Sequence, residues 1–283
     1  MERPPSCRTS ITYSFLWSYR LFNFCTPRQQ PTTATVMSAT ESPPAAPART
    51  TLTYWNGRGL CECIRLMLAA CGEEYDEAVP GCPGATHLSS PAQWAVLQES
   101  GALAMGSVPL LCIDGLQLVQ SQAIVRYLAR KHGLCGDPAS AADAARCDIV
   151  AETVLDWKRA IGVAFEYSLN AYEPTDAQRA ALVAGNAKFL PRLEACLRRN
   201  GESTGQQHFV GGSLTYADLV ALEPLEQIAP YEDLGAFPLL RALHAALRAR
   251  PRLAAWLASD RRKTKDQAGV AAYKASVHHT LHD

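Results

Sequence analysis

Residues 51–60 read Thr51-Leu-Thr-Tyr-Trp-Asn-Gly-Arg-Gly-Leu60, and this stretch decides how the remainder of the chain is organised. Strand-forming side chains run as far as Trp55, and the glycines at Gly57 and Gly59 then interrupt the strand. Apolar residues recur at helical spacing from there to Cys71. The stretch therefore predicts a strand, a glycine-rich turn and a helix in succession.

Tyr54 closes the predicted strand beside the first turn of the predicted helix. The free N–H groups and the dipole of a helix N-terminus favour a negative charge, and a phenol can donate to a thiolate. A thiol with a pKa of about 8.5 is only a few per cent ionised at neutral pH, so a donor that stabilises the thiolate makes it more reactive. Tyr54 is thus a candidate catalytic hydroxyl, and a half-buried tyrosine of an ordinary tight turn is the alternative.

The composition is that of a globular protein with one or two domains, since 48% of the 283 residues are hydrophobic. The 27 basic and 27 acidic residues cancel, which argues against nucleic acid as a partner. The ten cysteines are scattered, and we read them as reduced thiols of a cytoplasmic protein. Neither Cys61 with Cys63 nor His278 with His279 has the second pair that a metal site needs, so we expect no metal.

Residues 1–50 differ from the rest because they are rich in Ser, Thr and Pro and carry arginine with little acid. We interpret them as a disordered extension, with translation starting instead at Met37, in preference to a mitochondrial targeting peptide. The apolar segment Ile11–Cys25 is too short to cross a bilayer, so we expect no stable membrane insertion.

Residues 51–133 predict a small α/β domain. A strand is expected at Tyr75–Val79, and two more in Ser107–Val119, where Asp114-Gly115 marks a hairpin turn. Pro109 opens the first hairpin strand, where a cis bond would turn the backbone of the preceding residue outward. The helix Gln122–Lys131 follows Gln120-Ser121, with Ser121 as its expected N-cap.

Residues 138–283 predict helices alone. Thr215 and Asp218 have the spacing of a capping box at the start of one of them. The others are expected at Ala141–Ala171, Asp176–Arg199, Pro238–Ala249, Pro251–Ser259 and Gln267–Leu281.

Taken together, these residues resemble a cytosolic glutathione transferase, most similar to the alpha class with the sigma class next nearest. The resemblance covers about residues 51–280. It is carried by the order of Tyr54-Trp-Asn-Gly-Arg-Gly with Glu62 and Arg65, Val108-Pro109, Asp114-Gly115, Gln120-Ser121, Glu152 with Asp156, and Thr215 with Asp218.

The resemblance implies a thioredoxin-like N-terminal domain that binds glutathione and an all-α C-terminal domain that completes a pocket for hydrophobic electrophiles. It also implies a homodimer, in which Asp156 reaches the glutathione of the neighbouring subunit. Tyr54 would be the catalytic hydroxyl. The residues implied to bind glutathione are Tyr54, Arg58, Gln98, Ser107, Val108, Pro109, Gln120, Ser121, Asp156 and Lys188, and those implied to line the second pocket are Trp55, Ala160, Val163, Ala164, Tyr167 and Tyr273.

Two positions depart from the alpha-class pattern. Leu60 stands where that class usually has a second basic residue, and Ser107 stands where it usually has glutamine. Fewer cations would weaken thiol acidification, so a non-catalytic carrier of apolar ligands is an alternative. A glutathione-dependent isomerase of prostaglandin or steroid type would share the chemistry of Tyr54, and Cys61 as a nucleophile is out of register with the thiol-type branches of the superfamily.

Overall fold

The computed structural model describes residues 49–161, 175–263, 272–273 and 275–276. The predicted N-terminal extension and most of the predicted helix Gln267–Leu281 lie outside these residues.

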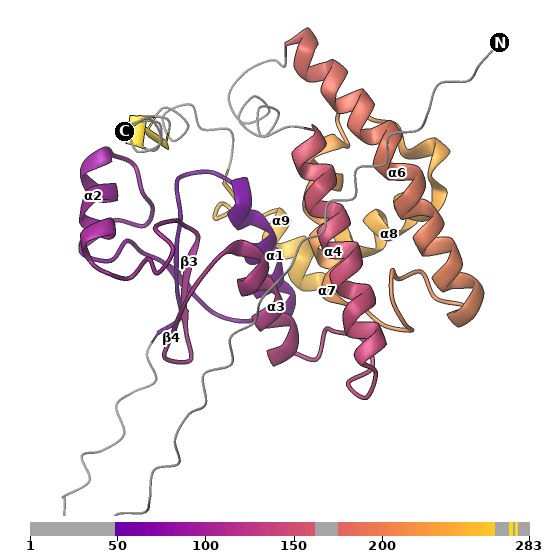
Figure 1. Ribbon diagram of the computed structural model, residues 1–283, viewed down its shortest axis with the longest axis horizontal. Coiled ribbons are helices and arrows are strands. Elements are labelled where there is room, and N and C mark those ends of the chain that lie inside the picture. The colour runs from indigo at the N-terminus through magenta and orange to yellow at the C-terminus, as the bar shows by residue number, and fades with distance from the viewer. Residues whose placement is uncertain (1–48, 162–174, 264–271, 274, 277–283) are drawn as a thin grey trace, which may run out of the picture. The chain divides into compact units, whose positions relative to one another are not determined.

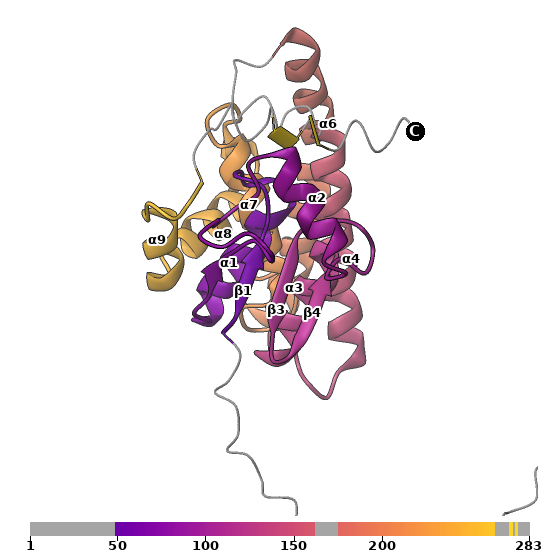
Figure 2. The same ribbon diagram turned by 90° about the vertical axis from the view of Figure 1, so that its left-hand side faces the viewer.

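A four-stranded mixed sheet forms the centre of the N-terminal half (Figures 1 and 2). Its strands are β1 (Thr51–Thr53), β2 (Asp76–Glu77), β3 (Leu110–Ile113) and β4 (Leu116–Val119), in the order β2-β1-β3-β4. β2 pairs with β1 in parallel, and the other pairs are antiparallel. The strand expected at Tyr75–Val79 is shorter than predicted, because only Asp76 and Glu77 lie in register with Thr51 and Leu52 of β1.

The predicted hairpin is confirmed between β3 and β4. Its two turn residues both have positive φ, 52° at Asp114 and 76° at Gly115. This backbone twist matches the right-handed twist of the paired strands, which is why Asp-Gly is favoured there.

Helices cover both faces of the sheet (Figure 2). A 3₁₀ turn (Gly59–Cys61) leads into α1 (Glu62–Cys71), which ends at Gly72 in the left-handed conformation. α1 and α3 (Ser121–Lys131) bury apolar side chains with Leu52, Leu111 and Ile113 of the sheet. α2 (Pro91–Glu99) lies in a second cluster with Leu110 on the other face.

The described part of the C-terminal half is helical. Its elements are α4 (Ala141–Ile161), α6 (Asp176–Thr204), α7 (Tyr216–Ile228), a 3₁₀ turn at Leu234–Ala236, α8 (Pro238–Arg248) and α9 (Pro251–Leu257). α6 begins at Asp176 as predicted, after a capping box of Thr175 and Gln178, and it ends later than predicted because the chain stays helical until Gly205 adopts positive φ. The last ten residues of the helix predicted to reach Ala171 lie outside the described residues. None of the helices in the described ranges is long and apolar enough to span a bilayer.

The predicted capping box of α7 is confirmed. The backbone N–H of Thr215 donates to Asp218 over 2.8 Å, and the N–H of Phe209 donates to the same carboxylate over 2.9 Å. Both Thr215 and Asp218 are fully buried. The carboxylate therefore joins the loop before α7 to the first turn of the helix.

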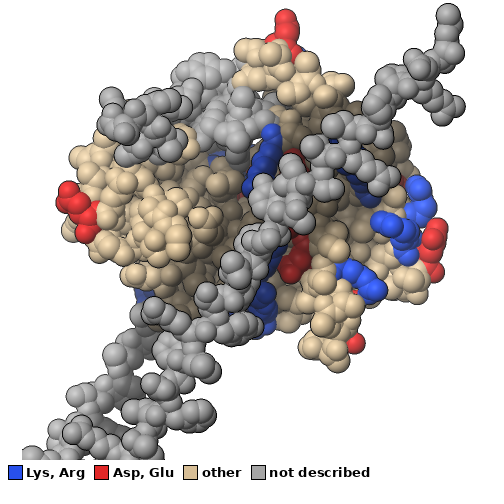
Figure 3. Space-filling view, viewed as in Figure 1, with Lys and Arg blue, Asp and Glu red and all other residues tan. Residues whose placement is uncertain are grey.

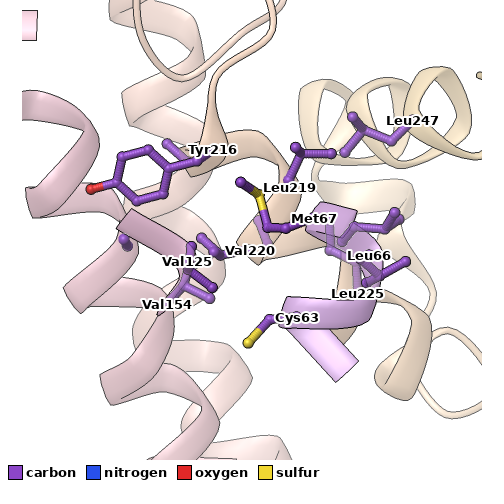
Figure 4. Close-up of a cluster of buried hydrophobic side chains, with 14 of the residues drawn as sticks. Cys63, Leu66, Met67, Val125, Val154, Tyr216, Leu219, Val220, Leu225 and Leu247 are labelled. Atoms are coloured by element: carbon purple, nitrogen blue, oxygen red, sulfur yellow. The ribbon is translucent and has the colours of Figure 1, made fainter. Parts of the chain in front are cut away.

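α1 and α7 share one apolar core (Figure 4). In Figure 4, Met67 of α1 lies beside Leu219 of α7, and Leu66 lies beside Leu225 of the same helix. Val125 from α3, Val154 from α4 and Leu247 from α8 join the same cluster. The helix that follows the Tyr54 turn is thus packed directly against the helical half.

Candidate active site

Three candidate segments meet at one end of the sheet. Thr53 of β1 pairs with Leu110 of β3, and Leu110 pairs with Val119 of β4. Tyr54 follows the first of these residues, Pro109 precedes the second and Gln120 follows the third. The register of the sheet therefore brings Tyr54 to the same end as two residues that lie more than fifty positions later in the sequence.

The hydroxyl of Tyr54 lies at the start of the helix, as the sequence predicts. The backbone N–H of Leu60 donates to Tyr54 Oη over 3.1 Å. Gly59 has a φ of 39°, and a Cβ atom there would lie 2.4 Å from Tyr54 Oη. Only glycine allows the turn to approach the phenol this closely.

Two arginines hold the turn from behind. Arg65 Nη1 donates to the carbonyl of Gly57 over 2.8 Å, and Arg58 Nε donates to the carbonyl of Lys263 over 2.8 Å. Burial lowers the pKa of Arg58, and the neighbouring Arg262 lowers it further. In this conformation Arg58 supports the turn, and a direct contact with glutathione stays a prediction.

A buried ionic cluster anchors Arg65. Its Nε lies 2.7 Å from Glu77 Oε1, and its Nη1 lies 3.5 Å from Glu62 Oε2, so Glu62 and Arg65 of the sequence pattern form an ion pair. Burial alone would lower the pKa of Arg65, but the negative charges of Glu77 and Glu62 beside it help to outweigh burial, and the pKa is raised. Arg65 thus stays a cation inside the protein.

Cys61 is a poor nucleophile in this fold. Its side chain is fully buried, and burial raises the pKa of the thiol to about 12. Because the thiolate is the reactive form, Cys61 is essentially unreactive at neutral pH. This agrees with the register, which also disfavours a thiol-type mechanism.

The other two segments at the sheet end have unusual backbones. The Val108–Pro109 peptide bond is cis, as the sequence suggests. Gln120 has a φ of 70° and a ψ of 109°, a region that residues other than glycine rarely adopt. Ser121 is the first residue of α3 and not its N-cap, because the helix begins one residue earlier than predicted.

An aromatic cluster borders Tyr54. The rings of Trp55 and Trp94 lie 5.7 Å apart, and Tyr273 meets Trp55 edge-on at 5.7 Å. Trp94 is only 7% exposed, and its indole N–H finds no hydrogen-bond partner among the described residues. Sequence reasoning missed Trp94, although a tryptophan in a helix next to the candidate loop was a visible signal. A buried donor without a partner suggests a ligand group.

The remaining candidates lie elsewhere or stay untested. Gln98 is exposed at the end of α2, and Ser107 is half-buried in the loop before β3. Asp156 is exposed on α4 and pairs with Arg159 over 3.2 Å, and Lys188 lies over the ring of Phe189 on α6. Ala160 is exposed near the end of α4, and Val163, Ala164 and Tyr167 lie outside the described residues.

The surface around α2 carries little charge. Figure 3 shows few Lys, Arg, Asp and Glu side chains on that side of the face, and more of both signs toward α4 and α6. The helix that carries Trp94 thus lies on the weakly charged side of the face that is shown.

Comparison with known proteins agrees with the resemblance in the sequence. The family model described as the N-terminal domain of glutathione S-transferase matches residues 50–130, and the C-terminal domain model matches residues 155–260. Glutathione S-transferase A1 of Mus musculus is 33% identical over 210 residues, which covers 73% of this chain and 86% of the mouse protein. The chain belongs to the glutathione S-transferase family.

Solved structures of other glutathione transferases confirm the predicted fold class. The enzyme from Ascaris lumbricoides is 28% identical with a TM-score of 0.62, and the alignment covers 77% of this transferase and 100% of that chain. Na-GST-3 from Necator americanus, described as monomeric, is 27% identical with a TM-score of 0.61 over the same shares. The transferase thus combines a thioredoxin-like N-terminal part with an all-α C-terminal part.

Proposed function

We propose that this transferase joins the thiolate of reduced glutathione to hydrophobic electrophiles, and that Tyr54 stabilises the thiolate. The observation that carries the assignment is the hydrogen bond from the Leu60 N–H to Tyr54 Oη. That bond makes the phenol a better donor, because its oxygen already accepts from an N–H at a positive helix end.

The energetic demand on Tyr54 is modest. Lowering a thiol pKa from about 8.5 by about two units requires roughly 2.7 kcal/mol of preferential stabilisation of the anion. A hydrogen bond to a charged partner contributes about 1.5 to 3 kcal/mol. A single phenol can therefore supply most of the free energy needed to stabilise the thiolate, and the N-terminal end of the helix can supply the remainder.

The sheet end supplies the groups that hold the peptide part of glutathione. The backbone of Val108 offers hydrogen bonds beside Tyr54, and the N-terminus of α3 at Ser121 suits a carboxylate. The strained Gln120 backbone fits a binding role, because such conformations cluster at ligand sites. The unpartnered indole N–H of Trp94 is suited to the second carboxylate.

The hydrophobic electrophile would bind beside Trp55 and Tyr273, whose rings are in contact. Leu60, in the turn next to Tyr54, is 42% exposed and adds apolar surface near the place proposed for the glutathione sulfur. Arg58, Gln98, Ser107 and the pocket residues of α4 stay predictions for this reaction.

Tyr54→Phe tests the proposal. The variant should fold as the wild type does and lose at least about tenfold in kcat/KM with a standard aromatic electrophile, because one charge-assisted hydrogen bond is lost. Unchanged activity would remove Tyr54 from the mechanism. Glutathione binding without turnover of a broad panel of electrophiles would instead favour a carrier.

We further propose a homodimer in a reducing compartment such as the cytoplasm. Met105, Ile149 and Val183 are large apolar side chains with exposures of 69%, 65% and 64%. The eight described cysteines are all free thiols. Light scattering of the purified protein decides the oligomeric state, and an alternative monomer has a precedent in the Necator protein.

A further inference from the structure

We infer that Arg262 is a positioning residue for the turn that presents Tyr54, and that it increases the stabilisation of the bound thiolate. Arg262 follows α9, and nothing in the sequence pattern connects it with the N-terminal site. The inference rests on the proposed function, since it concerns the thiolate that Tyr54 would stabilise.

The turn is fixed on one side and contacts the phenol on the other. Arg65 donates to the carbonyl of Gly57 in the turn. Arg58, which is part of the turn, donates to the carbonyl of Lys263. The other end of the turn bears the Leu60 N–H that reaches Tyr54 Oη. A shift of the two arginines would therefore move the N–H that polarises the phenol.

Arg262 joins the carboxylates behind the turn. Its Nε lies 3.3 Å from Glu62 Oε1, and its Nη2 lies 3.3 Å from Glu226 Oε2 of α7. Glu62 is fully buried and is also the partner of Arg65. Arg262 thus ties the first turn of α1 to α7, at the carboxylate on which Arg65 depends.

Lys263 extends this connection by one residue. Its carbonyl accepts from Arg58, and its Nζ lies 2.7 Å from Glu77 Oε2. The other oxygen of Glu77 binds Arg65 Nε over 2.7 Å. The adjacent residues Arg262 and Lys263 therefore reach both arginines of the turn.

Other charged groups around the cluster are paired. His244 and Arg248 of α8 both contact Glu226, over 2.6 Å and 2.8 Å. Glu223 of α7 lies 2.6 Å from Lys158 of α4. Its negative charge opposes the lowering of the Arg58 pKa.

The charges of the cluster favour an anion nearby. Among the described side chains that hold the turn, four are cations and three are carboxylates: Arg58, Arg65, Arg262 and Lys263 against Glu62, Glu77 and Glu226. Removal of Arg262 would take one positive charge from behind the turn and leave the buried Glu62 and the half-buried Glu226 with one partner fewer each. Geometry and charge would then both weaken the stabilisation of a thiolate beside Tyr54.

Arg262→Met and Arg261→Met form a matched pair of variants. The two arginines are neighbours, but Arg261 stacks on Tyr75 at 4.5 Å and donates to its carbonyl, away from the turn. The pKa of enzyme-bound glutathione is measured by the ultraviolet absorbance of its thiolate, and kcat/KM is measured against pH.

Arg262→Met should raise the pKa of the bound thiol by about one pH unit, from about 6.5 to about 7.5, so that kcat/KM falls about threefold at pH 7, falls about tenfold well below these pKa values and recovers in alkali. Arg261→Met should leave both quantities as in the wild type. If Arg262→Met does not fold, Arg262→Gln, which keeps a donor for Glu62 but no charge, should show the same rise.

A thiol pKa in the folded Arg262 variant equal to that of Arg261→Met would overturn the inference. A uniform loss of activity at all pH values with an unchanged thiol pKa would also overturn it, since that is a structural defect alone. If glutathione bound to the wild type titrates like free glutathione, the proposed role of Tyr54 fails first, and the inference fails with it.

Discussion

The backbone N–H of Leu60 donates to the phenol oxygen of Tyr54 over 3.1 Å. This contact joins the first residue after β1 to the 3₁₀ turn that precedes α1, and it exists because Gly59 lets the chain pass directly against the ring. The residue whose side chain departs from the alpha-class pattern thus contributes through its main chain.

Gly59→Ala should disrupt this contact. A Cβ atom would lie 2.4 Å from Tyr54 Oη, and the φ of 39° disfavours alanine, so the turn or the phenol must move. We expect kcat/KM to fall by at least about tenfold, which corresponds to about 1.4 kcal/mol. Gly57→Ala is the matched control, because a Cβ there meets nothing within 4 Å. Equal activity in the two variants would show that the close approach is dispensable.

Trp94→Phe should weaken glutathione binding. If the buried indole N–H donates to a carboxylate of glutathione, its loss raises Kd by about 10- to 100-fold, while kcat at saturating glutathione changes little. Calorimetric titration measures the Kd. Trp157→Phe should leave Kd unchanged and lower stability, because that indole N–H donates to the buried Asn186 over 3.0 Å. A wild-type Kd in Trp94→Phe would contradict the assignment.

Asp218→Ala should destabilise the fold without acting on chemistry. The buried carboxylate accepts from the N–H groups of Thr215 and Phe209, so its removal leaves two buried donors unpaired. We expect a loss of at least about 2 kcal/mol in the free energy of unfolding, measured with urea. Asp233→Ala, which removes an exposed cap to Gly235, should cost less than about 1 kcal/mol. Similar losses in both variants would disprove the special role of the buried cap.

The thiol of Cys61 should make stability fall in alkali. Burial raises its pKa to about 12 in the folded protein, whereas an unfolded thiol titrates near about 8.5. Between these values the folded state binds more protons than the unfolded state, so the free energy of unfolding decreases as pH rises. Cys61→Ala should therefore lose less stability between about pH 8.5 and 11 than the wild type does. Parallel stability curves for the two proteins would refute this.

Local patterns predicted most of the fold. Asp114-Gly115 specified its hairpin and Thr215 with Asp218 specified a helix start, because each depends on residues a few positions apart. The sequence also placed Tyr54 at the helix start. It did not reveal the bond from Arg58 to the carbonyl of Lys263, which spans 205 positions, since any main-chain carbonyl is an equal acceptor in the sequence. Contacts of this kind are fixed only when the helices pack.

Two residues near the end of α2 show that the sequence was also an incomplete guide to the candidate site. Trp94 and Gln98 lie one helical turn apart, yet Trp94 is buried against Trp55 and Gln98 is exposed. The sequence pattern assigned glutathione binding to Gln98, because it is the polar residue of the two. Burial of an indole N–H without a partner depends on the neighbours that the fold supplies, and these are not visible in composition or periodicity.

The core that α1 and α7 share has a consequence for cooperativity. Leu66, Met67 and the side chains they touch would be exposed to water if either half unfolded alone, so partial unfolding is costly. Heating should therefore unfold both halves in a single transition. The calorimetric enthalpy of unfolding should then equal the van't Hoff enthalpy. A fragment that ends before α4 would carry its half of this core uncovered and would be prone to aggregate.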